Sequence, residues 1–389
     1  GGGLYIIREK ALDEEKINAA GTVMLLWSWG LGIFLIFISV FLDDFFQIND
    51  LNHLVQILSV SFFIAPFTGV LFSLNTRVLN YSGLMKAQVI SQAVNIISTL
   101  TCLFLGFKYY SMAIGLLLST ITEFVILNLI SKHPPFFKVT FTGLNKVMSF
   151  GFFSSISAII NRLIKAIPEL LIGKYFNSYS VGIFSRGNGF IFFVEEIIIQ
   201  AVKPVALPML SKAVRDGTSV KNKYIDSSVL LSGVCLPIFI TISIVAYPVI
   251  LFLFGAQWGE SVQYAQLLAV AGTIKVAHSF SASVLIACLY EKYLLFKQLI
   301  LLVISMIVLF YTKESLTLLC YGLIVIAFVD FVLTTFLLKI YLGLGVFEFV
   351  KAHMKNMWMS VISGGVAYIL SQVVDFENTA LLYSVVILA

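Results

Sequence analysis

Charge is the scarcest property of this sequence. Asp, Glu, Lys and Arg together make up 12% of its 389 residues, whereas a soluble domain carries about 25%. Hydrophobic residues make up 59%, and the mean hydropathy is +0.99. The formal net charge is +5, but the basic residues lie in short loops between apolar runs, where they set membrane topology. These features exclude a soluble domain and a nucleic-acid partner, and they predict an all-α, polytopic helical membrane protein.

The sequence also lacks the motifs of catalytic and nucleotide-binding sites. It contains no Gly-Lys-Ser/Thr phosphate loop, no HExxH and no GxSxG, so an ATP-driven pump or a hydrolase would lack its machinery. The four cysteines lie in apolar segments without CxxC spacing, which indicates packing residues rather than a disulfide or a metal site; they are Cys102, Cys235, Cys288 and Cys320. We therefore predict no enzyme activity, no catalytic residue, no bound metal and no cofactor.

Long apolar runs dominate what remains. A membrane helix needs about 20 apolar residues, and this criterion predicts eleven spans, with a twelfth that begins near 380 and is cut off at Ala389. The eleven are 19–42, 53–76, 84–106, 110–131, 147–172, 179–203, 226–254, 262–287, 293–311, 315–338 and 356–374. The chain opens on Gly1 without an initiator Met or a signal peptide, so we expect that the start of the protein is absent.

The distribution of Lys and Arg among the loops predicts the orientation in the membrane. The N-terminal segment and alternate loops after it hold eighteen of these residues, Lys297 among them. The opposite loops hold three, which are Lys108, Lys174 and Lys313. Because cytoplasmic loops carry the excess of positive charge, residue 1 is predicted to lie in the cytoplasm.

An internal repeat organises the chain into two lobes. An offset of 210 residues aligns 51–90 with 261–300 without a gap, with nine identities that include Gln88 with Gln298. The order of the spans agrees, so we expect a parallel six-helix repeat about an axis along the membrane normal. The predicted N-terminal lobe is 1–146, with its first two helices missing. The C-terminal lobe is 147–345, and 346–389 holds extra C-terminal helices, the last of them cut.

Several short motifs occur in the order and at the spacing of one transporter family. They are Ser149-Phe150-Gly151, Leu171-Ile172-Gly173-Lys174, Gly182-Ile183-Phe184-Ser185-Arg186, Leu207-Pro208-Met209-Leu210-Ser211, and Leu253-Phe254-Gly255 followed by Trp258. In these pieces the chain resembles the Wzx-type polysaccharide flippases of the multidrug/oligosaccharidyl-lipid/polysaccharide (MOP) exporter superfamily, which also contains the MATE transporters. It departs from the family where members often carry Asp, because Pro168 followed by Glu169 stands there.

The resemblance implies a function and a place in the cell. Such proteins are V-shaped, fourteen-helix transporters that move an undecaprenyl-diphosphate-linked oligosaccharide to the outer leaflet for surface polysaccharide, such as the O-antigen of lipopolysaccharide. The implied location is the inner membrane of a bacterium, with the lipid bilayer and the polysaccharide polymerase machinery as further partners. The implied cavity helices of the C-terminal lobe are 147–172, 179–203, 262–287 and 293–311.

Four cations inside predicted spans are candidates for binding the lipid diphosphate. Charge inside a membrane is costly unless it faces a wet cavity or a partner, and all four lie on the implied cavity helices: Arg162, Lys165, Arg186 and Lys275. Arginine suits phosphate through its bidentate fork. The alternative is internal pairing, for instance of Lys165 with Glu169. His278 lies about one turn from Lys275, where it is either a titrating cavity residue or a hydrogen-bonded packing residue.

Four acidic residues inside the spans are candidates for ion coupling. They are Glu195, Glu196, Glu123 and Asp330. Intramembrane carboxylates typically relay protons or bind cations, and pairing with the buried cations is the alternative. Two other functions compete with the flippase. A drug or cation antiporter of the same superfamily would favour a cavity dominated by carboxylates and aromatic residues. A membrane-embedded glycan polymerase or acyltransferase would need a large outer loop, and every predicted outer loop is short.

Overall fold

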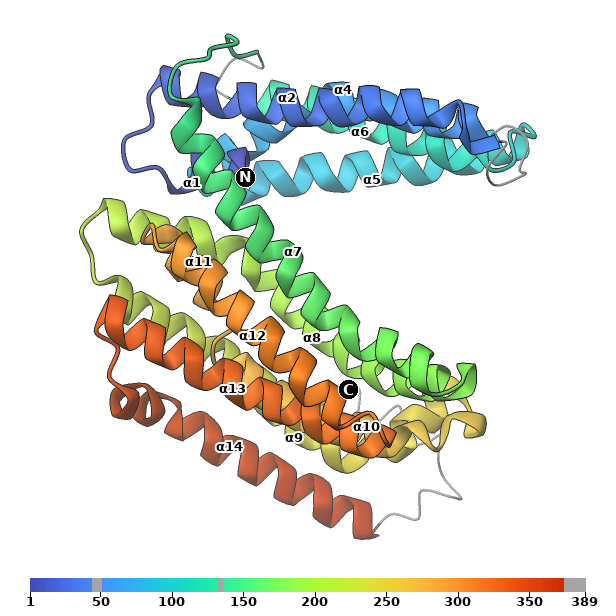
Figure 1. Ribbon diagram of the computed structural model, residues 1–389, viewed down its shortest axis with the longest axis vertical. Helices are drawn as coiled ribbons and strands as arrows, with labels where there is room; N and C mark the ends of the chain where they lie inside the picture. The colour runs from blue at the N-terminus through green and yellow to red at the C-terminus, as the bar shows by residue number, and fades with distance from the viewer. Residues whose placement is uncertain (44–50, 132–135, 374–389) are drawn as a thin grey trace. The chain divides into compact units, whose positions relative to one another are not determined.

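The structure is helical throughout the part of the chain that it describes. The computed structural model describes residues 1–43, 51–131 and 136–373, and within these ranges it contains no strand (Figure 1). The helices are α1 (Gly2–Arg8), α2 (Glu14–Ser39), α4 (Leu51–Arg77), α5 (Tyr81–Phe104), α6 (Tyr110–Ile130), α7 (Leu144–Tyr175), α8 (Ser178–Arg215), α9 (Val220–Phe254), η1 (Ala256–Trp258), α10 (Ser261–Val276), α11 (Ser281–Ala287), α12 (Glu291–Tyr311), α13 (Leu316–Leu342) and α14 (Val346–Val373).

The lengths of these helices confirm the predicted membrane protein. Nine helices of the described chain are long and apolar enough to cross a membrane, with α10 and α11 counted as one span. The predicted spans 179–203 and 356–374 lie in α8 and α14, which fall outside this set of nine. The predicted twelfth span near 380 lies outside the described residues.

The ends of several helices follow directly from local sequence. Asp13, Asn177, Ser219 and Ser315 precede α2, α8, α9 and α13, and each side chain accepts a hydrogen bond from a backbone N–H three residues later. These short polar side chains satisfy donors that the first helical turn leaves unpaired. At the other end, α13 stops at Gly343, whose φ of 65° lies in the left-handed region. Glycine adopts this conformation at the lowest energetic cost, because it has no Cβ atom.

Two compact units divide the chain, at a point within α7. The first unit is Gly1–Ser155 and the second begins at Ile156, close to the lobe boundary predicted after residue 146. In the first unit α4 packs against both α2 and α6, and α5 packs against α6 (Figure 1). The α5–α6 contact is tight at Gly115, where a Cβ atom would lie 2.1 Å from Oγ1 of Thr99. Only glycine allows this approach.

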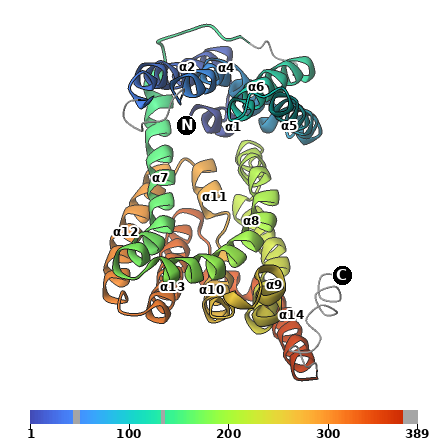
Figure 2. The same ribbon diagram turned by 90° about the vertical axis from the view of Figure 1, so that its right-hand side faces the viewer.

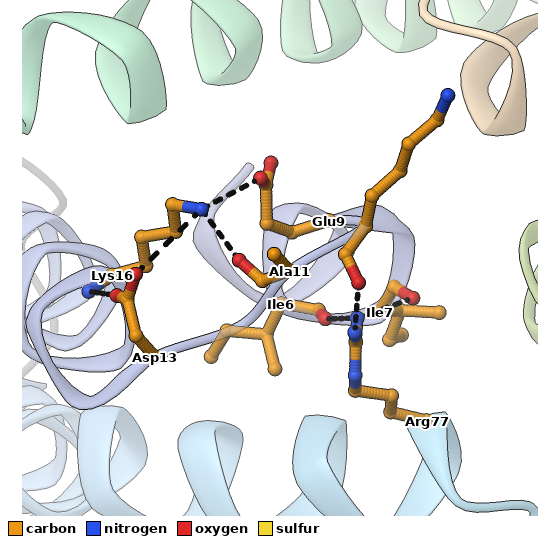
Figure 3. A network of polar contacts seen from close by, with 8 residues as sticks. Ile6, Ile7, Glu9, Ala11, Asp13, Lys16 and Arg77 are labelled. Carbon is orange, nitrogen blue, oxygen red and sulfur yellow. Dashed lines mark hydrogen bonds and ion pairs between the residues drawn. The ribbon is translucent and has the colours of Figure 1, made fainter. Parts of the chain in front are cut away.

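The short helix α1 was not predicted from the sequence. It packs against α2 and α4, and Arg77 at the end of α4 binds its last carbonyls (Figure 3). Nη1 of Arg77 donates to the carbonyl oxygens of Ile6 at 2.7 Å and Ile7 at 3.2 Å, and Nη2 donates to that of Lys10 at 3.3 Å. A charged donor at these carbonyls supplies partners that the end of a helix otherwise lacks. Arg77 is one of the eighteen Lys and Arg residues that predict the orientation in the membrane. It also caps a helix.

In the second unit, α10 makes its main contacts with three long helices. It packs against α8, α9 and α13, while α14 lies along α9 and α12 lies along α13 (Figures 1 and 2). The approach of α8 to α10 depends on Gly187, since a Cβ atom there would lie 2.9 Å from the carbonyl oxygen of Ser261 and 3.1 Å from the backbone nitrogen of Ala265. This close contact gives a structural reason for the glycine that follows Arg186.

The predicted span 262–287 corresponds to one candidate membrane span, Ser261–Ala287, which the structure divides into two helices. The helix breaks between Val276 and Ser281 and continues as α11. A break exposes backbone carbonyls that must find other donors inside a membrane; here the hydroxyl of Ser228 on α9 donates to the carbonyl of Ala277. The repeat survives the break, because α4 ends at Arg77 and α11 ends at Ala287, and because α5 begins at Tyr81 and α12 at Glu291. Both pairs of residues are 210 positions apart.

Candidate functional site

A polar cavity lies inside the second unit. Its volume is about 500 Å³, and its walls come from α7, α8, α10, α12 and α13. Its lining is Asn161, Arg162, Ile164, Lys165, Ala166, Pro168, Glu169, Phe184, Asn188, Gly189, Ile191, Phe192, Glu195, Leu268, Ala271, Gly272, Lys275, Leu301, Leu323, Ile326, Ala327 and Asp330. The four helices expected to line a cavity are all represented, and α13 is an additional wall.

Three of the four candidate cations line this cavity. Arg162 and Lys165 lie one turn apart on α7, and Lys275 lies on α10. Within the described chain, none of the three side chains forms an ion pair. Lys165 does not pair with Glu169, and its Nζ atom lies 5.9 Å from the ring centre of Phe192. Charge inside a membrane span is expensive unless it reaches water or a partner, which makes this cavity a candidate site for an anionic ligand.

The carboxylates of the cavity differ in their partners. Glu195 and Glu169 line it without an ion pair in the described chain. Asp330 on α13 pairs with Lys297 on α12, whose Nζ atom donates to Oδ1 of Asp330 at 2.6 Å and to Oγ1 of Thr334 at 3.0 Å. The side chain of Lys297 is only 4% exposed. Among the described side chains, and together with Lys297, the cavity region carries four cations and three carboxylates.

Sequence reasoning missed the role of Lys297. It was counted with the loop cations that set topology, although its position falls inside the predicted span 293–311. Asp330 likewise falls inside a predicted span, 315–338. Two opposite charges inside neighbouring spans could have suggested an ion pair between the two residues. Which acid the lysine contacts depends on how α12 packs against α13, and the sequence alone does not determine that packing.

Arg186 is not among the residues that line the cavity. Its guanidinium carbon lies 4.9 Å from the ring centre of Trp258 and 5.4 Å from that of Phe254. Arginine over an aromatic face is stabilised by the negative potential of the ring. Arg186 lies against the aromatic residues around the end of α9, and its predicted role in substrate binding stays a prediction.

His278 is also outside the cavity lining, in the break between α10 and α11. It is buried, with Nδ1 at 2.7 Å from the hydroxyl of Tyr224 and Nε2 at 2.8 Å from Oγ1 of Thr335. The ring of Phe349 stacks on it with a centroid distance of 4.7 Å. Both ring nitrogens are engaged, so the alternative of a hydrogen-bonded packing residue describes this environment.

The two remaining candidates are not part of the described cavity. Glu123 lies on α6, in the first unit. The side chain of Glu196 lies outside the described part of the structure. Across the described residues, no three His, Cys, Asp or Glu side chains gather closely enough to hold a metal ion. The site is thus a cavity of cations, carboxylates and the amides of Asn161 and Asn188, suited to an anionic ligand that also carries hydrogen-bond donors.

Comparisons with known proteins agree with this fold. A family model described as "Polysaccharide biosynthesis protein" matches residues 1–263. The chain is similar to the teichuronic acid biosynthesis protein TuaB of Bacillus subtilis, with 24% identity over 301 residues, 74% of this chain and 60% of TuaB. It is also similar to the succinoglycan biosynthesis transport protein ExoT of Rhizobium meliloti, with 23% identity over 56% of this chain and 44% of ExoT.

A solved structure shares the fold. It is an outward-facing multidrug resistance MATE family transporter of the MOP superfamily, similar with a TM-score of 0.66 and 17% identity over 92% of this chain and 82% of that chain. At this identity the similarity concerns the arrangement of helices. The all-α, MATE-like helical fold predicted from the sequence is confirmed.

Proposed function

The chain belongs to the family of polysaccharide biosynthesis proteins, and on that premise we propose that it is a flippase for an undecaprenyl-diphosphate-linked oligosaccharide. It takes the lipid from the cytoplasmic leaflet and releases it in the outer leaflet of the bacterial inner membrane, by alternating access and without enzymatic chemistry. The names of TuaB and ExoT, which refer to biosynthesis or transport of surface glycans, support this proposal.

The observation that carries the proposal is a group of three cations that form no ion pair with the residues that the structure describes. Arg162, Lys165 and Lys275 converge from α7 and α10 on one cavity. A diphosphate supplies the anionic oxygens that these side chains lack, and Arg162 can bind two of them with its planar fork. The cavity volume of about 500 Å³ is within the range of about 300–1,000 Å³ typical of small-molecule sites. This is large enough for a headgroup, while the lipid tail remains in the bilayer.

Ion coupling is assigned in the same cavity to Glu195. This side chain lines the cavity and makes no ion pair in the described chain, so a proton or a cation can exchange on it. Asp330 is a weaker candidate because Lys297 already neutralises it at 2.6 Å. The chain is further proposed to deliver its product to the polysaccharide polymerase machinery.

A drug or cation antiporter remains the second candidate. The similarity to MATE transporters and the carboxylates of the cavity favour it. The unpaired cations oppose it, since a cationic drug entering the cavity would meet Arg162, Lys165 and Lys275 and be repelled.

Replacement of Arg162 in the intact gene product tests the flippase. We expect Arg162→Ala to reduce surface polysaccharide strongly at a normal protein level, because the diphosphate loses a charged, two-pronged donor that is exposed in the cavity. Arg162→Lys keeps the charge without the fork and should recover part of the activity. The readouts are membrane protein level and surface polysaccharide, measured together.

The control lies on the same helix. Lys174 is near the outer end of α7, outside the cavity, with Nζ 5.4 Å from the ring centre of Tyr175. Lys174→Ala should leave polysaccharide unchanged. Normal polysaccharide in Arg162→Ala at a normal protein level would contradict the proposal.

A further inference from the structure

Asp330 lines the cavity and commits one of its two carboxylate oxygens to hydrogen bonds within the protein. Oδ1 accepts from Lys297 at 2.6 Å and from Thr334 at 3.5 Å. Within the described chain, Oδ2 accepts no hydrogen bond, and the side chain retains 34% exposure while it lines the cavity. An ionised carboxylate is only an acceptor, so Oδ2 is an acceptor held in a fixed position for a donor from the cavity.

Lys297 makes this acceptor compatible with an anionic ligand. Its ammonium group is buried, and two of its three donors go to Asp330 and Thr334. A positive charge at this distance cancels much of the field that an ionised carboxylate exerts in the cavity. A phosphate held by Arg162 and Lys275 is therefore not repelled by Asp330 as it would be by an unpaired carboxylate. The pair supplies an acceptor without a net negative charge.

The donors that such an acceptor would meet are sugar hydroxyls. This step rests on the proposed function: if the three cations hold a diphosphate, the group bonded to it on the side away from the lipid is a sugar. Each hydroxyl of a sugar is a donor as well as an acceptor. The amides of Asn161 and Asn188 and the ring of Phe192 line the same cavity, and they supply further hydrogen bonds and an apolar face. The cavity thus contains groups for both parts of the ligand.

We propose that Asp330, held by Lys297, accepts hydroxyl hydrogen bonds from the sugar attached to the diphosphate and thereby determines glycan specificity. The cations of α7 and α10 bind the part common to all such lipids. The Asp330–Lys297 pair on α13 and α12 binds the part that differs between them. A site built to bond a hydroxyl discriminates against ligands without it, because the acceptor then loses its partner.

A double variant tests the proposal in the intact gene product. Asp330→Leu with Lys297→Met replaces the pair by apolar side chains of similar size, which usually preserves folding. The two probes are bare undecaprenyl diphosphate and the lipid-linked glycan extracted from a strain in which the gene is deleted. Affinities are measured on purified protein by native mass spectrometry. We expect the wild type to prefer the glycan-bearing lipid and the double variant to lose about 10- to 100-fold of that preference, with the affinity for the bare diphosphate retained.

Two further variants separate the roles. Lys297→Met alone leaves an uncompensated carboxylate, so it should also weaken binding of the bare diphosphate. Lys221→Met with Glu348→Gln is the matched control, since it removes an ion pair of 2.7 Å between α9 and α14 outside the cavity; it should change neither affinity. If the apolar pair lowers the amount of folded protein, Asp330→Asn with Lys297→Met provides the same comparison with a smaller change in polarity.

The outcomes are distinct. A double variant that keeps the wild-type preference, as expected for a purely structural ion pair, overturns the inference. A wild type that binds both probes equally also overturns it, while the flippase proposal stands. A wild type that binds neither probe contradicts the proposed function itself.

Discussion

Two arginines that look alike in the sequence have different surroundings in the structure. Both Arg162 and Arg186 lie inside apolar segments of the implied cavity helices. Arg162 lines the cavity, whereas Arg186 lies over the rings of Trp258 and Phe254. Whether a cation faces a cavity or a ring depends on the residues that neighbouring helices bring to it, and hydropathy contains no such information.

Replacement of Arg186 should therefore affect stability more than transport. At an exposed site a cation–π contact contributes about 0.5–1 kcal/mol. We expect Arg186→Ala to lower the thermal midpoint of the purified protein slightly, and Arg186→Lys to retain much of the contact. Surface polysaccharide should fall only as far as the protein level falls. A complete loss of polysaccharide at a normal protein level would instead assign Arg186 to the transport path.

At the scale of helices, the sequence predicted which segments are helical better than it predicted how they end and break. Apolar runs predict the spans, because an uninterrupted helix pairs the hydrogen-bonding groups of the backbone inside a membrane. The break after Val276 was missed because it depends on tertiary partners, with Ser228 donating to the carbonyl of Ala277 and His278 bonded to Tyr224. No proline marks the position. The helix α1 was missed because seven residues are too few for the criterion of length.

Close packing of α8 on α10 leads to a prediction for Gly187. A Cβ atom at this position would approach two backbone atoms, the carbonyl oxygen of Ser261 and the nitrogen of Ala265, and neither can move aside as a flexible side chain would. Such overpacking costs about 1–3 kcal/mol. Gly187→Ala is expected to lower the thermal midpoint and, because α10 carries Lys275, to weaken ligand binding.

Gly365 in α14 is the matched control for this substitution. It is also inside a helix, and a Cβ atom there meets nothing within 4 Å. Gly365→Ala should be neutral or stabilise the protein by up to about 1 kcal/mol, the difference in helix propensity. Equal midpoints for the two variants would show that α8 and α10 are not in close contact.

For the whole molecule, the sequence predicts an orientation that a labelling experiment can check. The basis is the distribution of eighteen Lys and Arg residues against three between alternate loops. In a background without the four native cysteines, a cysteine at Asn52 or Glu260 should react with an impermeant thiol reagent added outside intact cells. Cysteines at Ser82, Lys138 and Gly217 should react only after the membrane is permeabilised. Labelling at Lys138 in intact cells would overturn the predicted order of helices.

The cap that Arg77 places on α1 has a consequence for synthesis of the chain. The capping guanidinium lies 71 residues after the carbonyl of Ile6 that it binds, so it does not exist when α1 leaves the ribosome. At a synthesis rate of about 5–20 residues per second, the interval between the synthesis of Ile6 and that of Arg77 is roughly 4 to 14 s. During that time α1 lacks this cap, and the contacts that it makes with α4 in the folded protein can form only after α4 has been synthesised.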